Sequence, residues 1–74
     1  MEKIPALTPR KVVAALKRAG FKERRQRGSH LLLCHSERHV TVIVPMHAGD
    51  LPRGTLRAII REAGLTDAEF LDLL

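Results

Sequence analysis

Two adjacent runs of strand-forming residues constrain the fold of this chain most. Residues 39–44 are β-branched at every position from Val40 onward, and Pro45 ends the run because proline cannot donate to a sheet ladder. Residues 30–35 precede this run and are rich in leucine. Only the segment 36–38 separates the two runs, a length typical of a hairpin connection. The sequence therefore predicts an antiparallel pair of strands at its centre.

Two amphipathic helices are predicted on either side of this pair. Thr8 is a hydroxyl N-cap, Pro9 occupies the first helical position, and apolar residues then recur at helical spacing until Gly20. Residues 56–63 repeat the same spacing and end at Gly64. Both segments therefore present one apolar face to a core.

Three shorter segments complete the predicted order of elements. Residues 21–26 follow the first helix directly and lead to a turn at Gly28 and Ser29, so we expect a short strand with exposed charged side chains there. Residues 46–54 contain glycine and proline and are predicted to form a loop. Residues 66–69 match a capping box, which begins a short last helix.

The order of elements predicts a single α+β domain over residues 1–74. A three-stranded antiparallel sheet with two helices on one face and a short C-terminal helix is the simplest architecture for this order. The central strand is apolar on both faces, with Leu31 and Leu33 on one and Leu32 and Cys34 on the other. Helices on one side leave the second face open, so we expect a partner protein or self-association to cover it.

The charge of the chain favours a polyanionic partner. The formal net charge is +5, but residues 1–30 hold nine basic and two acidic residues, a net charge of +7. Phe21 and Phe70 are the only aromatic residues, which excludes a surface that binds single strands by aromatic stacking. The composition therefore indicates nucleic-acid binding through phosphates and shape.

The remaining composition narrows the class of protein. The apolar runs are too short to span a membrane, and the N-terminus lacks the apolar segment of a signal peptide. Cys34 is the single cysteine, so an internal disulfide is excluded. We therefore expect a cytoplasmic protein without a membrane partner.

His30 is the first candidate for catalysis. It follows Arg24, Arg25 and Arg27 closely in the sequence and directly follows the predicted turn. An imidazole can take the proton of a ribose 2′-hydroxyl or protonate a leaving oxygen, while guanidinium groups bind the scissile phosphate. The alternative interpretation is a surface histidine beside solvated arginines.

The other histidines carry weaker signals. His47 lies in the predicted loop, where it either contacts phosphate, acts as a second acid or base, or bonds a backbone carbonyl. His35 and His39 flank the hairpin and are expected to be exposed; the alternative is that His35 pairs across the strands with His39. Together with Cys34, these residues do not reproduce a zinc-binding spacing, and no paired carboxylates lie near a histidine. We expect neither a metal site nor a cofactor.

Several motifs along the chain together resemble one family. In the first half these are Leu7–Pro9, Ala19–Phe21 and Arg27–His30; in the second half they are Val44–Gly49, Leu51–Leu56, Ile59–Ile60 and Ala63–Leu65. In this order and spacing they resemble the HicA-type toxins, also called the YcfA family. The resemblance covers nearly the whole chain.

The resemblance implies a fold like that of a double-stranded-RNA-binding domain and a toxin of a type II toxin–antitoxin pair. Such toxins cleave mRNA and stop translation until a HicB-type antitoxin binds them. The histidine of the Gly-Ser-His motif is the family's catalytic residue, which implies this role for His30. We expect RNA contacts from Lys11, Arg24, Arg25, Arg27, Gly28, Ser29 and His47.

The mechanism and the assembly stay open at this point. We hypothesise a metal-independent attack by the 2′-hydroxyl, which gives a 2′,3′-cyclic phosphate and a 5′-hydroxyl. The alternative function is a non-catalytic RNA-binding module that recognises the backbone and the A-form shape. A homodimer and a toxin–antitoxin hetero-oligomer are both compatible with the open apolar face.

Overall fold

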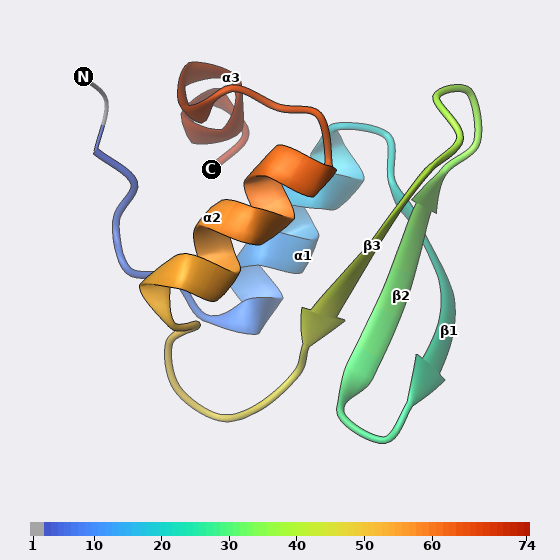
Figure 1. Ribbon diagram of the computed structural model, residues 1–74, viewed down its shortest axis with the longest axis horizontal. Coiled ribbons are helices and arrows are strands. Elements are labelled where there is room, and N and C mark those ends of the chain that lie inside the picture. Colours follow the sequence, from blue (N-terminus) through green and yellow to red (C-terminus); the bar gives the residue numbers. More distant parts are fainter. Residues whose placement is uncertain (1–2) are drawn as a thin grey trace.

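The chain folds into three antiparallel strands and three helices in the computed structural model, which describes residues 3–74. The elements are α1 (Pro9–Arg18), β1 (Lys22–Arg27), β2 (His30–His35), β3 (Val40–Pro45), α2 (Arg53–Glu62) and α3 (Asp67–Asp72). The sheet has the order β1-β2-β3, and α1 and α2 lie on one side of it (Figure 1). The predicted α+β architecture, with its likeness to a double-stranded-RNA-binding domain, is confirmed.

The helix starts follow from the predicted caps. The hydroxyl of Thr8 accepts a hydrogen bond from the backbone N–H of Lys11 at 3.4 Å, and Pro9 opens α1. At α3, Thr66 N–H donates to the carboxylate of Glu69 at 2.8 Å, and Glu69 N–H donates to the Thr66 hydroxyl at 3.1 Å. These bonds satisfy N–H groups that the first helical turn leaves without partners.

Two predicted boundaries differ from the structure by one or two residues. Phe21 is buried in the core, so β1 begins one residue later than predicted. The loop after β3 ends at Pro52, whose carbonyl accepts a hydrogen bond from Leu56 N–H at 2.9 Å. Because this bond already belongs to a helical turn, α2 begins at Arg53, inside the segment predicted as loop.

The β3 strand is also displaced from its predicted range. His39 has a φ of 55°, in the left-handed region that a regular strand does not use, and therefore belongs to the hairpin. At the other end Pro45 still pairs with His30, so it is the last residue of the strand rather than the residue after it.

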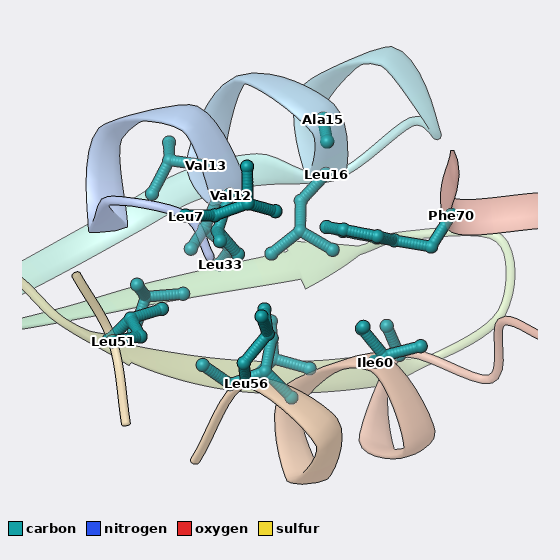
Figure 2. Close-up of a cluster of buried hydrophobic side chains, with 14 of the residues drawn as sticks. Leu7, Val12, Val13, Ala15, Leu16, Leu33, Leu51, Leu56, Ile60 and Phe70 are labelled. Carbon is teal, nitrogen blue, oxygen red and sulfur yellow. The ribbon is translucent and has the colours of Figure 1, made fainter. Parts of the chain in front are cut away.

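One hydrophobic core lies between the sheet and the helices (Figure 2). Leu33 of β2 is fully buried there, and Leu16 of α1, Leu56 of α2 and Phe70 of α3 surround the same space. Burying each such side chain contributes about 1.5–3 kcal/mol of transfer free energy, which holds the helices on this face. The core therefore fixes which face of the sheet stays open.

The alternation of β2 leaves apolar side chains on the open face. Leu31 and Leu33 are buried toward the helices, whereas Leu32 and Cys34 are only half-buried. Ile43, the partner of Leu32 on β3, is 51% exposed. The predicted second apolar face is therefore present, on the side of the sheet opposite to the helices.

His35 differs from the prediction of an exposed hairpin residue. Its ring packs edge-on against Phe21, with ring centroids 5.3 Å apart and an interplanar angle of 80°. Its Nδ1 accepts a hydrogen bond from Arg38 N–H at 3.3 Å. His35 is half-buried and pairs with Val40, not with His39, which is exposed as predicted.

Candidate functional site

The turn between β1 and β2 places Arg27 directly opposite His30. These two residues are Cα partners, and only Gly28 and Ser29 separate them. Gly28 has a φ of 54°, and a positive φ at the first position of a two-residue loop is typical of a type II′ hairpin turn. Directly paired residues project from the same face of a sheet, so the guanidinium and the imidazole lie on the same side.

A β-bulge in β1 adds further arginines to that side. Glu23 pairs with Leu33 and Arg25 with Leu32, so Arg24 is an extra residue between them. Such a bulge lets two successive residues oppose a single partner. Without it, strict alternation would place Arg25 on the helix-covered face.

The same bulge keeps the acidic residue of β1 away from the arginines. Glu23 pairs with the inward-facing Leu33, and its carboxylate forms an ion pair with the ammonium group of Lys17 on α1. The pair is half-exposed, so it contributes little to stability. The pair matters for the charge of the open face, because it keeps the negative charge of Glu23 on the helix side of the sheet.

Arg25, Arg27 and His30 meet at one hollow on the open face. Leu32 and Ile43 form the apolar part of its lining. All three polar residues are exposed, and they come from β1 and the start of β2. The hollow thus combines two groups that bind phosphate with one that transfers protons.

His47 lies near this end of the sheet but points to its own backbone. Met46 N–H donates a hydrogen bond to the carbonyl of Ser29, which brings the loop after β3 beside the turn. The Nδ1 of His47 lies 3.1 Å from the carbonyl oxygen of Ala48. The backbone therefore places the loop of His47 beside the turn that precedes His30. The side chain of His47, however, contacts the backbone of the next residue.

Lys11 is the predicted RNA-binding residue that the fold separates from the others. It lies on α1 and lines a different hollow, together with Arg18 and Leu74. Most of its lining residues belong to α1, which lies on the side of the sheet opposite to the open face. The structure thus brings together His30 with Arg25 and Arg27, places Arg24 beside them, and leaves Lys11 apart.

Ile43 is the lining residue that the sequence analysis did not single out. The signal is present in the sequence, because Val42 and Val44 alternate with it and can both be buried only if Ile43 is exposed. Cys34, also on this face, has its Sγ 3.3 Å from the hydroxyl of Thr41. Side chains on the open face therefore come from all three strands.

Two further properties concern the whole described segment. Over residues 3–74, no group of three or more His, Cys, Asp and Glu side chains is arranged to hold a metal ion. In the same range, no helix has the length and apolar character needed to cross a membrane.

The fold and this surface define a small α+β domain with a basic, partly apolar open sheet face. Residues 9–65, more than half of the chain, match the family described as HicA toxin of bacterial toxin–antitoxin systems. The chain therefore belongs to the HicA toxin family, as its motifs predicted. No match was found among curated proteins. Family membership makes the protein a toxin of a toxin–antitoxin system, with an antitoxin as its partner.

Proposed function

We propose that this toxin is an endoribonuclease that cleaves mRNA in the cytoplasm and so inhibits translation, and that a HicB-type antitoxin neutralises it. The observation that carries the proposal is the cross-strand pair of Arg27 and His30, with Arg25 at the same hollow. A general acid or base next to two phosphate-binding groups is an arrangement suited to phosphodiester cleavage.

The proposed step is a transesterification within the RNA strand. The neutral imidazole of His30 takes the proton of a ribose 2′-hydroxyl, and the 2′-oxygen forms a bond to the adjacent phosphorus. The bond between phosphorus and the 5′-oxygen breaks, and the 5′-oxygen receives a proton from the imidazolium. The products are a 2′,3′-cyclic phosphate and a 5′-hydroxyl, and His30 returns to its starting state.

The arginines bind the non-bridging phosphate oxygens in this proposal. Their fixed positive charge stabilises the negative charge that develops as the 2′-oxygen attacks. Acid–base catalysis by one histidine supplies about 10²- to 10⁴-fold, so positioning of the phosphate by Arg25 and Arg27 has to add to it. Neither a metal ion nor a cofactor takes part in the proposed step.

Product analysis of a labelled RNA tests this function. Purified wild-type protein is incubated with the RNA, with and without EDTA, beside the same sequence carrying 2′-deoxyribose at the cleaved nucleotide. We expect cyclic-phosphate and 5′-hydroxyl ends, no effect of EDTA, and an uncut deoxy substrate. Products with 3′-hydroxyl and 5′-phosphate ends would contradict the mechanism. RNA that is bound but left intact would favour the non-catalytic RNA-binding module.

A further inference from the structure

A second hollow lies near the hairpin end of the sheet, beyond the one that contains His30. It lies where the open face meets the hairpin, and its lining consists of Arg24, Cys34, His35, Ser36, His39, Val40 and Thr41. Cys34 and Thr41 belong to the open face, as the next outward pair after Leu32 and Ile43. Two hollows therefore follow one another along the strands, the first on the open face and the second at its hairpin end.

The bulge in β1 distributes two successive arginines between these hollows. Arg25 lines the hollow of His30, whereas Arg24 lines the second hollow. With a rise of about 3.3 Å per residue, Arg24 and Arg27 are separated by roughly 10 Å along the strand. One anionic group bound by Arg27 and another bound by Arg24 would thus belong to different nucleotides.

The outward positions of the sheet favour a polyanion along β1. Lys22, Arg24, Arg25 and Arg27 are exposed, and Glu23 is held on the other side by Lys17. Among the outward positions of the three described strands there is no carboxylate. A strand of phosphates laid along β1 thus meets only positive or neutral side chains on the sheet.

Leu32 and Ile43 lie beside the arginines and supply an apolar floor. Ile43 is 51% exposed, unusually high for a large apolar residue in this molecule, and it pairs directly with Leu32. An unstacked base can cover such a surface with its flat face. The bases of a duplex keep their faces stacked inside the helix and cannot do so.

We propose that the open sheet face binds a single, unstacked RNA strand across two subsites. Its backbone follows the arginines of β1, and one base covers Leu32 and Ile43. A phosphate beyond the scissile one binds Arg24 in the second hollow. This inference rests on the proposed function for its substrate, RNA. It assigns Arg24, from which the sequence already predicts an RNA contact, to a second subsite, and it adds Ile43 as a residue that contacts the RNA.

Binding measurements with an uncut substrate test the second subsite. The His30→Ala protein is titrated with a labelled hexauridylate, and an unlabelled triuridylate is measured as its competitor. We expect Arg24→Gln, in the His30→Ala background, to lower the affinity for the hexamer by roughly three- to tenfold. The same substitution should change the affinity for the trimer by less than about twofold, because the trimer is fully bound at the first hollow. The control variant Arg61→Gln removes an equal charge from exposed α2 and should change neither affinity.

The apolar floor has a separate readout. Ile43→Ser should lower the affinity for both oligonucleotides by a similar factor, since both place a base over the first hollow. A fully paired RNA duplex should bind less tightly than the single strand. Ile43 and Arg24 are both exposed, so urea unfolding should show all variants equally folded.

Three results would overturn the proposal. The first is an equal effect of Arg24→Gln and Arg61→Gln on the hexamer, and the second is tighter binding of the duplex. The third is unchanged RNA binding by Arg24→Gln and Ile43→Ser while both lose affinity for the antitoxin, which would make the face a protein interface. Wild-type cleavage is measured separately. If the wild-type protein binds the hexamer more tightly than the trimer but cleaves no RNA, the proposed nuclease activity is wrong and the proposed second subsite stands.

Discussion

Arg27 and His30 are paired across the turn of Gly28 and Ser29, on the sheet face that the helices leave open. The pairing depends on the backbone of Gly28, whose φ is 54°. A side chain at this φ brings its Cβ close to the following carbonyl, whatever the surrounding space. The relative position of the proposed general base and its phosphate-binding neighbour is therefore set by one glycine.

Gly28→Ala should lower the free energy of unfolding by about 1–2 kcal/mol. The matched variant Gly54→Ala should instead raise it by about 0.5–1 kcal/mol, because Gly54 lies within α2, where alanine is the better helix former. A Cβ at either position meets no atom within 4 Å, so steric contact does not separate the two variants. Urea unfolding measures both, and changes of the same sign would contradict this account of the turn.

The two faces of β2 predict opposite sensitivities for neighbouring leucines. Leu33→Ala should destabilise the protein by about 2–5 kcal/mol, because Leu33 is fully buried and leaves a cavity. Leu32→Ala should cost about 1 kcal/mol or less, since its side chain is on the open face. Denaturant midpoints of the two variants check this. Comparable losses would mean that both faces are packed.

The capping box of α3 should make stability depend on acid pH. Hydrogen bonds from the backbone and side chain of Thr66, helped by the charge of Arg38, hold the pKa of Glu69 below its ordinary value of 4.5. The unfolded chain therefore takes up this proton first as the pH falls. The stabilisation is fully present above pH 4.5 and is lost as the pH falls through the folded-state pKa.

Comparison with Glu69→Gln isolates this contribution. The stability difference between wild type and variant should be constant near neutral pH and should disappear in acid, where Glu69 is protonated as well. Thermal unfolding from pH 7 to pH 3 measures the difference. A difference that does not change with pH would mean that the charge of Glu69 plays no part in the cap.

The position of Lys11 predicts that it contributes little to cleavage. Arg27→Gln should lower kcat/KM by roughly ten- to a hundredfold, because a charged hydrogen-bond partner of the phosphate is lost. Lys11→Gln removes the same charge from α1, away from the hollow of His30, and should change kcat/KM by less than about twofold at moderate salt. Steady-state kinetics at two salt concentrations check both. Equal losses of kcat/KM in Arg27→Gln and Lys11→Gln would mean that the RNA also contacts the helix layer.

Local signals in the sequence were sufficient for most of the fold. Thr8 with Pro9, and Thr66 with Glu69, mark helix starts through bonds that lie within one turn. The β-branched run of β3 and the short hairpin specify the strand pair in the same local way. The turn residues Gly28 and Ser29 also identify the position of His30 at the start of a strand.

The features that were not predicted depend on contacts between distant residues. The bulge at Arg24 has no local signal, because β1 is exposed and polar throughout and its alternation carries no information. His35 is half-buried because the ring of Phe21 packs against it, and Phe21 lies in the segment between α1 and β1. Lys11 is separated from His30 by the packing of α1 on the sheet, which the net charge of a segment does not reveal.

Single-turnover cleavage by His30→Ala tests the central claim most directly. The variant and the wild type are given the same labelled RNA at saturating protein concentration, and urea unfolding is used to show that both are folded. The account predicts a rate about 10²- to 10⁴-fold lower for His30→Ala, with partial recovery when imidazole is added to the solution. Equal cleavage rates for wild type and a folded His30→Ala protein would contradict it.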